Sequence, residues 1–408
     1  MRIGIGTSLT GAGVAPKAET AAVSWDATND TYSAPTGFEI GPTSIHKAMR
    51  RCVLSDAGVV QYYLDPNDST KKADGTSANL DGTDGQVMVE IPKFYFKYEY
   101  SSPTHTYKIS DRPQTGFNLH PAFVKAGVEV DYRYMGAYEG IWYDASAGGG
   151  AGAYADPDNS DALSVDTAND KIGSISGQYP IVGVTRPSCR LMSANVGTGW
   201  HQQDWYLTHA VQLLFVTEYG DFNSQEVVSD GNVNYSSWPT GSGNTISNPS
   251  GLSNSLGNGT GGVSTAGGSV NDFVTYRGIE NFWGSVWQWV DGVNVNVNSD
   301  LDSWWTTNDY RNFADDTASG YTKLTDSMPA DGYVKDFKDV ADGFIPSVTG
   351  GTSSTFVGDF FFDDNNNLNR VVRFGGNADN GAFAGAFFWT VRRASSARGR
   401  AIGCRLSF

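Results

Sequence analysis

No stretch of the 408-residue chain is apolar for long enough to span a membrane, and its start, MRIGIGTSLTGAG, lacks the apolar segment of a secretory signal. We therefore expect folding in a cytoplasm without a signal peptide, and no membrane insertion. The chain is also poor in positive charge, with a net charge of -16 and a pI near 4.6. Because nonspecific binding to nucleic acid needs clustered Lys and Arg, we expect no nucleic-acid partner.

Motifs typical of catalysis or metal binding are missing as well. The three cysteines, Cys52, Cys189 and Cys404, have no CxxC spacing, which predicts buried free thiols instead of a disulfide framework or a zinc site. The five histidines form no HxxxH or HExxH pattern, and the chain has neither a GxSxG elbow nor a P-loop. We expect no catalytic residues, no metal and no cofactor.

Glycine and aromatic residues, in contrast, are plentiful. The 49 glycines and the 13% of aromatic residues favour an α+β or β-rich protein with many turns. Residues 65–85 are polar and rich in turn formers. They predict a boundary between a small β-rich N-terminal domain, 1–85, and a larger domain, 86–408.

Periodicity predicts several elements of the larger domain. Residues 87–100 favour strand structure interrupted by a proline, and 128–134 alternate Val and Tyr with charged residues as in an amphipathic strand. A helix is predicted after the N-cap Asp204, ending at Gly220. The Gly, Ser, Asn and Thr-rich part of 230–275 predicts a long insertion loop.

Two tryptophans spaced by two residues mark a further strand. Trp287 and Trp289 share one of its faces, whereas Val286, Gln288 and Val290 share the other. We interpret both tryptophans as core residues in preference to ligand-stacking residues, with each indole N–H bonded to a nearby acceptor.

Residues 370–408 differ in composition from the rest of the chain. They hold 7 of the 16 arginines and one acidic residue, and they contain no Lys, Glu, Gln or Met. No codon of the form NNC encodes those four amino acids, whereas Asp, Phe, Thr, Arg, Ala and Gly can all be reached from the Asn codon AAC by changing adenines. The composition therefore indicates that codons of this region have changed at adenines. A pair of Arg-rich strands whose charges are solvated is an equally open interpretation.

Four motifs, in the same order along the chain, resemble the variable proteins of diversity-generating retroelements, a family that includes receptor-binding proteins of phage tail tips. The motifs are HPAF…GVEVDYRYMGAYEG, LLFVTEYGDFNSQ, YRGIENFWGSVWQWVDG and the terminal GG…NG…AG.F.W…SS…IG.RLSF. The resemblance implies a C-type lectin-like α+β fold of the formylglycine-generating-enzyme subtype with long irregular insertions. It also implies that the region 370–408 is rewritten by adenine-directed reverse transcription on a fixed backbone.

The resemblance further implies a function and partners. The chain would be an adhesin at the tip of a phage tail fibre, made in the bacterial cytoplasm and acting outside the cell as part of the virion. Its partners would be a host cell-surface receptor, either protein or glycan, and other tail proteins. The N-terminal region, 1–85, would attach the chain to the virion or assemble it into a homotrimer.

The same resemblance divides positions near the C-terminus into exchangeable and fixed ones, and leaves Ala378 and Asn380 unassigned. The expected ligand-binding, exchangeable positions are Asp379, Phe383, Phe388, Thr390, Arg392, Arg393, Ala397, Arg398, Gly399, Arg400 and Ala401. The expected scaffold positions are Trp287, Trp289, Gly375, Gly376, Trp389, Gly403 and Arg405. Aromatic and Arg side chains carry much of the energy of interfaces, and an Arg-rich site favours an anionic or carboxylate-bearing ligand.

Three alternatives remain beside the phage adhesin. The first is an oxidase of the formylglycine-generating type, which would need reactive thiolates placed together. The second is a variable adhesin displayed on a bacterial surface. The third is calcium-dependent sugar binding, for which DDNNN at 363–367 offers oxygen ligands, although we interpret that run as a polar turn.

Overall fold

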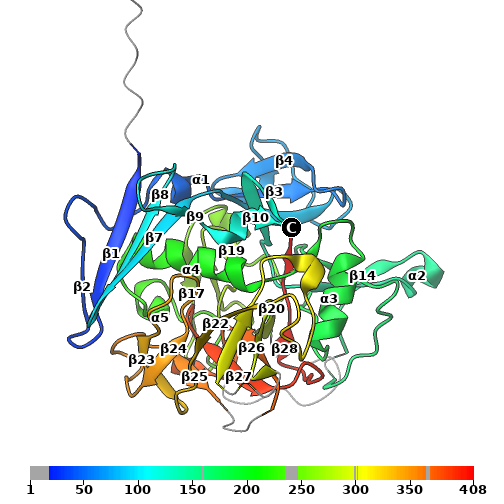
Figure 1. The fold of residues 1–408 in the computed structure, drawn as a ribbon. Helices are drawn as coiled ribbons and strands as arrows, with labels where there is room; N and C mark the ends of the chain where they lie inside the picture. The colour runs from blue at the N-terminus through cyan, green and yellow to red at the C-terminus, as the bar shows by residue number, and fades with distance from the viewer. Residues whose placement is uncertain (1–17, 159, 236–246, 298–299, 301, 364–367) are drawn as a thin grey trace, which may run out of the picture.

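A computed structural model describes residues 18–158, 160–235, 247–297, 300, 302–363 and 368–408. Within these ranges the protein is a mixed α+β structure in which strands outweigh helices, as the composition predicts. Three large sheets lie around one long helix, α4 (Trp205–Tyr219), which runs through the middle of the molecule (Figure 1).

Helix α4 forms as predicted because both of its ends are capped. The carboxylate of Asp204 accepts a hydrogen bond from the backbone N–H of Leu207 at 2.9 Å, and Gly220 ends the helix in the left-handed conformation with φ 66°. Every residue from Trp205 to Thr217 is buried. The helix is therefore an element of the core, covered on all sides.

The first sheet is fully antiparallel and covers one side of α4 through β1 and β8. Its strands, in spatial order, are β2 (Thr31–Ser33), β1 (Thr20–Asp26), β8 (Thr104–Ser110), β7 (Tyr95–Ser101) and β9 (Asn118–Leu119).

The second sheet joins residues on both sides of position 85. Its order is β16 (His201–Gln202), β29 (Leu406–Ser407), β12 (Tyr132–Gly136), β6 (Gln86–Pro92), β3 (Arg50–Leu54), β4 (Val60–Asp65) and β5 (Asp68–Lys72). β3 pairs with β6, so that Cys52 lies opposite Met88, and a single hydrophobic cluster extends from Ala21 to Val391. Residues 20–85 therefore share sheets and a hydrophobic core with residues after position 85, in contrast to the domain boundary expected there. Residues 1–17 lie outside the described ranges.

Strand formation at 87–100 is confirmed, because β6 ends at Pro92 and β7 begins at Tyr95. At 128–134 strands also form, in β11 (Val128–Glu129) and β12, but burial follows the amphipathic pattern only in part. Val128 and Tyr132 are exposed, whereas Arg133 is buried. Arg133 is accommodated because it donates to the carbonyl of Ala122 at 2.6 Å and forms an ion pair of 2.7 Å with Asp204.

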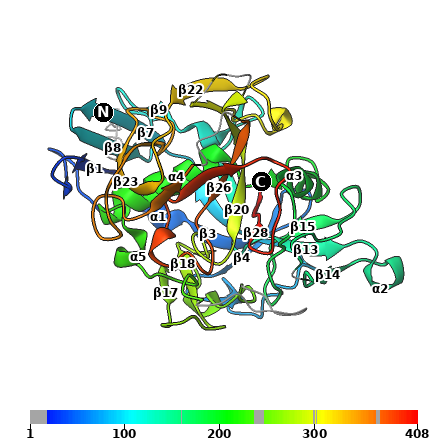
Figure 2. The ribbon, with the colours of Figure 1, turned by 90° about the horizontal axis from the view of Figure 1, so that it is seen from below.

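The third sheet carries the C-terminal strands. Its order is β22 (Thr322–Asp326), β21 (Ser303–Thr306), β20 (Trp287–Val295), β26 (Arg370–Phe374), β27 (Trp389–Arg393), β25 (Phe360–Phe362), β23 (Gly332–Phe337) and β24 (Pro346–Thr349), with β28 (Ile402–Gly403) pairing with β20. β20 contacts α4. Figure 1 shows β25, β26 and β27 together at the lower end of the molecule, and Figure 2, seen from that end, shows β26 beside β20.

Three small sheets and several short helices complete the described fold. The sheets are β10 (Val124–Lys125) with β11, β13 (Ile141–Asp144) with β14 (Ala153–Ala155) and β15 (Lys171–Gly173), and β17 (Gly261–Val263) with β18 (Phe273–Tyr276) and β19 (Ile279–Glu280). The other helices include α1 (Ser44–Ala48), α2 (Ala147–Gly150), α3 (Arg186–Ala194), α5 (Ser224–Val227), and the 3-10 turns η1 (Pro121–Phe123), η2 (Asn254–Leu256), η4 (Tyr310–Asn312) and η5 (Gly381–Phe383).

The expected insertion loop, 230–275, is in part an ordered element of the body. Residues 236–246 lie outside the described ranges, but β17 and β18 form within the remainder. Ser253 is fully buried and bonds to both Arg51 and Glu280, at 2.6 Å in each case. Hydrogen bonds of buried polar side chains, which composition does not reveal, hold this segment in place.

The N-cap of α4 provides a test of the core. We expect Asp204→Ala to lower the free energy of unfolding by roughly 3 to 5 kcal/mol, because it leaves the buried guanidinium of Arg133 without its counter-charge. Asp204→Asn keeps an acceptor for the N–H of Leu207 and should recover about 1 kcal/mol of that loss. Urea denaturation of both variants measures the difference, and a loss below about 1 kcal/mol for Asp204→Ala would show that the ion pair is dispensable.

Buried histidines make the fold sensitive to acid. Burial lowers the pKa of His46 to about 4 and those of His201 and His209 to about 3, and it holds the pKa of His120 well below the usual 6.5. Burial also raises the pKa of Glu139 to about 7 and that of Asp359 well above its usual value. The histidines resist protonation in the folded protein, whereas the two carboxyls favour it.

The balance of these groups predicts a loss of stability in acid. Below pH 6.5 the unfolded chain binds protons at four histidines that stay neutral in the folded protein, so stability falls as the pH falls. The carboxyls whose pKa burial raises, those of Glu139, Asp359, Asp221 and Asp342, act in the opposite sense and offset part of this loss. Urea midpoints measured across this pH range should fall with pH. A flat or rising profile would contradict the assigned burial.

Candidate ligand-binding site

Five of the expected exchangeable positions meet at one pocket of about 300 Å³ on a face of the third sheet. We refer to it as the terminal pocket. Its lining residues are Trp287, Phe362, Arg373, Asp379, Asn380, Phe383, Thr390, Arg392 and Arg393.

Strand register explains how the sheet brings these side chains together. Arg373 of β26 lies opposite Trp289 of β20 on one side and opposite Thr390 of β27 on the other, and Thr390 in turn lies opposite Phe362 of β25. Alternate residues of a strand share a face of the sheet. Trp287, two positions before Trp289, and Arg392, two positions after Thr390, therefore lie on the same face as Arg373. The terminal pocket is therefore the outward face of four adjacent strands.

A glycine pair closes one side of the pocket. Gly375 and Gly376 follow β26 with φ of 86° and 81°, and a Cβ on Gly376 would come within 2.5 Å of the Cβ of Ala384. These positions need glycine, as expected for scaffold. The turn directs residues 377–388, including η5, back over the sheet and places Phe383 at the pocket.

The floor of the pocket contains a buried guanidinium that has not been satisfied. Arg373 is 4% exposed, and its Cζ lies 4.4 Å from the ring centroid of Trp287 and 5.8 Å from that of Trp289. Its Nε is buried and has no hydrogen-bond partner among the described residues. Burial, with the nearby charges of Arg393 and Arg392, lowers the pKa of Arg373 to about 9.

Two further polar atoms of the pocket lack partners. The hydroxyl oxygen of Thr390, a residue that is 1% exposed, and the indole nitrogen of Trp287 are both buried without a hydrogen bond. These two atoms and the Nε of Arg373 are three of the buried polar atoms in the described residues that lack a hydrogen-bond partner. The fold therefore leaves polar groups beside the pocket without protein partners.

The rim of the pocket is charged. Arg393 is exposed, whereas Arg392 forms an ion pair with Asp331 and donates to the carbonyl of Asp363 at 2.9 Å. The exposed Asp379 contributes the one carboxylate among the lining residues. With Arg392 neutralised, Arg373 and Arg393 outweigh Asp379, so the local charge is positive.

Aromatic rings form the wall opposite to Arg373. The ring of Phe383 lies 4.5 Å from that of Phe360, 5.6 Å from that of Tyr333 and 5.9 Å from that of Phe362. The wall presents an apolar surface next to the charged floor.

Three of the sequence-based assignments need correction. Phe388 and Ala401 were expected to be exchangeable surface positions, but they are 0% and 4% exposed. Phe388 is covered because it packs on Phe362, and Ala401 packs with Val286 in a small apolar cluster. Trp287 was expected to be scaffold alone, yet it lines the terminal pocket with its indole N–H unpaired.

The remaining exchangeable positions lie in a separate loop, 394–401. Arg398 is exposed, and Ala397, Gly399 and Arg400 are half-buried. The backbone N–H of Arg400 donates to the carboxylate of Asp161 at 3.0 Å. None of these residues lines the terminal pocket, so the structure divides the expected surface into a pocket and a neighbouring loop.

The other scaffold positions are buried. Trp289 donates its indole N–H to the carbonyl of Val184 at 3.0 Å, and Trp389 donates to that of Phe344 at 3.0 Å. A Cβ on Gly403 would lie 2.3 Å from the carbonyl oxygen of Ile181, so this position has no room for a side chain.

The three cysteines lie inside the protein. Cys52, Cys189 and Cys404 are free and buried, as expected, and Cys189 lies next to Cys404. Burial, reinforced by Cys404, raises the pKa of Cys189 well above its usual value. Within the described ranges no three His, Cys, Asp or Glu side chains are grouped as metal ligands, and residues 364–367 of the DDNNN run lie outside those ranges.

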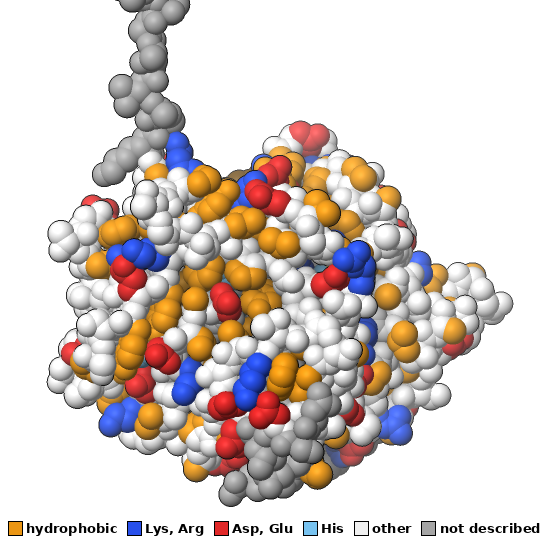
Figure 3. Space-filling model, viewed as in Figure 1, with side chains coloured by type: hydrophobic (Ala, Val, Ile, Leu, Met, Phe, Trp, Pro, Cys, Tyr) orange, Lys and Arg blue, Asp and Glu red, His pale blue; other side chains and the backbone are white. Residues whose placement is uncertain are grey.

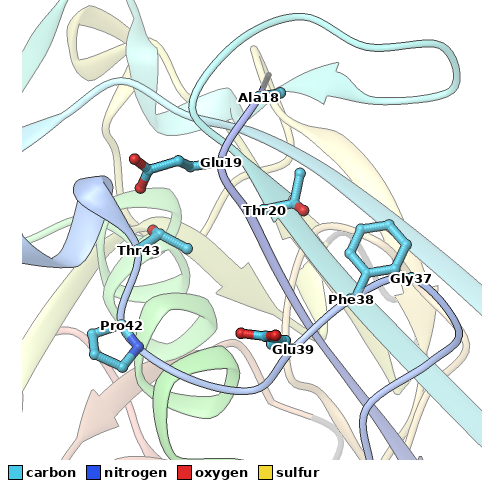
Figure 4. Close-up of a pocket in the computed structure, with 8 residues that line it drawn as sticks. All are labelled: Ala18, Glu19, Thr20, Gly37, Phe38, Glu39, Pro42 and Thr43. Atoms are coloured by element: carbon cyan, nitrogen blue, oxygen red, sulfur yellow. The ribbon is translucent and has the colours of Figure 1, made fainter. Parts of the chain in front are cut away.

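Two other pockets are lined by residues outside the strands of the third sheet. One of about 290 Å³ surrounds the start of β1, between Glu19 and Glu39 (Figure 4). Another, of about 460 Å³, lies between His201 and Tyr310. On the face seen in Figure 3, acidic and basic side chains lie in small mixed groups. Neither pocket collects residues that the sequence singled out.

Sequence reasoning missed Arg373 and Phe362 as site residues, and left Asn380 unassigned. Arg373 sits in RVVRF, an apolar strand in which a charged residue stands out. The charged residue in an apolar strand is thus visible in the sequence. Its place in the pocket is not, because that place follows from the pairing of Arg373 with Trp289 and Thr390 on the neighbouring strands.

Comparison with models of protein families and with curated proteins found no match to this chain. None of the helices in the described part of the chain is both long and apolar enough to cross a membrane.

The two tryptophans of β20 should respond differently to truncation. Trp289→Ala should lower the free energy of unfolding by about 3 to 5 kcal/mol, because it removes a fully buried indole. Trp287→Ala should cost less, because one side of this ring borders the open pocket. Thermal and urea denaturation of the two variants provide the comparison, and equal losses would show that Trp287 is a core residue.

Proposed function

We propose that the chain is a receptor-binding adhesin that recognises a ligand on a host cell through the terminal pocket and the neighbouring loop, 394–401. The observation that carries this proposal is that Asp379, Phe383, Arg392 and Arg393, all from the compositionally distinct region 370–408, line one pocket.

The arrangement of the chain supports presentation of this surface. Figure 1 shows that β1, with which the described chain starts, begins at the upper left of the molecule and runs down its side, whereas β25 to β27 lie at the lower end. An attachment through the N-terminal region would therefore leave the terminal pocket facing outward. This fits a protein at the tip of a phage tail fibre that acts outside the cell as part of the virion, with other tail proteins as partners and assembly as a trimer.

We also propose the C-type lectin-like fold of the formylglycine-generating-enzyme subtype, on which the C-terminal region would be diversified by a retroelement. A rigid sheet with one buried and one open face supports this proposal, because exchange of open-face side chains leaves the core intact.

Exchange of four exposed or half-buried positions tests the proposal. The variant Asp379→Asn, Phe383→Asn, Arg393→Asn and Arg398→Ser should stay folded, with a total loss of about 2 kcal/mol, because surface substitutions cost about half a kcal/mol each. It should lose binding to host bacteria, measured with the labelled full chain on a panel of strains. The matched control, Tyr100→Asn with Val263→Asn, replaces exposed residues elsewhere and should bind as the parent does.

Two outcomes would refute the adhesin. The first is that the parent chain binds no strain of the panel, and the second is that the fourfold variant binds as well as the parent. A near-copy of the terminal coding segment beside a reverse transcriptase gene, with mismatches confined to adenines, would distinguish a diversified protein from one with a fixed terminal surface.

A further inference from the structure

We propose that the terminal pocket binds a carboxylated sugar residue, of the hexuronate class, through the guanidinium of Arg373. This inference rests on the proposed function and names the ligand class of the same site. It starts from the contrast between Arg373 and the other buried arginines of the fold.

The fold satisfies its other fully buried guanidiniums. Arg51 donates to the carbonyl of Gly278 and to three side-chain oxygens, and Arg186 binds two carboxylate or amide side chains and three carbonyls. Arg405 donates four hydrogen bonds at 2.7 to 2.9 Å. Arg373 is buried to nearly the same degree, yet it stacks on Trp287 without any such acceptor.

An unpaired buried charge is costly, and a carboxylate is the group that relieves it best. Its two oxygens match the planar fork of a guanidinium, and the bond is charge-assisted. Arg393 adds a second positive charge at the rim, whereas Arg392 is already held by Asp331. The pocket therefore selects one negative group at its floor.

The other features of the pocket select a sugar ring as the carrier of this group. A volume of about 300 Å³ holds one monosaccharide but no folded element of a protein. Asp379 and Asn380 line the pocket with polar side chains, and the hydroxyl groups of a sugar can pair with such groups. The ring of Phe383 provides an apolar surface for the C–H face of the sugar. A Glu or Asp side chain of a peptide would pair with Arg373 but would not fill the part of the pocket beside Asn380 and Phe383.

The test uses the full chain and a set of immobilised oligosaccharides that carry hexuronates, each printed beside its carboxyl-reduced form. We expect binding to at least one acidic oligosaccharide, and at least tenfold weaker binding to its reduced form. Arg373→Gln should weaken that binding at least tenfold. Arg112→Gln removes an equal charge beside β8 in the first sheet and should bind within twofold of the parent.

A second variant keeps the test decisive if Arg373→Gln does not fold. Arg393→Gln changes an exposed rim residue and should weaken binding severalfold with an unchanged melting temperature. The inference is overturned if no oligosaccharide binds in a carboxylate-dependent way, if Arg393→Gln and a folded Arg373→Gln bind as the parent does, or if a triglutamate peptide competes better than the acidic sugar.

The two proposals can fail separately. If the chain binds host cells but ignores the carboxylate, the ligand class is wrong and the adhesin stands. If the chain binds acidic sugars but no cells, the pocket chemistry stands and the adhesin is wrong.

Discussion

Arg405, three residues from the C-terminus, provides the contact on which the arrangement of the terminal region depends. Its guanidinium, fully buried, donates to the side chain of Gln288 and to the carbonyls of Gly136, Glu280 and Asn281. Burial lowers its pKa to about 10, but the four acceptors hold the charge in the core. One residue thus joins the last strands to β12, β19 and β20, so that the end of the chain is part of the framework.

This framework gives the third sheet two different faces. On the inner face, Trp389 packs on Trp205 of α4 and on Phe374, with ring centroids 5.0 and 5.1 Å apart. On the outer face, Arg373 and Thr390 border the terminal pocket. Neighbouring residues of a strand point to opposite faces. In a strand such as β27, alternate side chains therefore pack in the core or line the pocket. The same backbone can therefore tolerate exchange at one set of positions while the other set stays fixed.

The polar groups of the pocket are paired differently from many of those in the core. Buried side chains such as Ser253 and Glu280 pair with each other within the fold, although further buried polar atoms, for example in Asn232 and Thr275, also lack partners. At the pocket, Arg373 and Thr390 keep unpaired atoms at a position where the sheet is open. A site that leaves polar groups unsatisfied in the free protein gains free energy when a matching ligand pairs with them, and it discriminates against ligands that cannot.

The sequence by itself determined the elements whose signals are local. The caps Asp204 and Gly220 specified α4, the break after Pro92 separated β6 from β7, and the glycine pair Gly375 and Gly376 marked a turn. Such signals act between residues a few positions apart, through backbone hydrogen bonds and allowed φ values, so that they are legible without a structure.

Only the tertiary structure decided which faces are buried and which residues meet. Arg133 is buried because Asp204 lies beside it, 71 positions away, and no pattern within 128–134 contains that partner. Residues before and after position 85 belong to one sheet because β3 pairs with β6. Arg373 lines the pocket because the strand register places it between Trp289 and Thr390. Strand pairing and ion pairs between distant segments fix these choices, since burial is a property of the neighbours that the fold supplies.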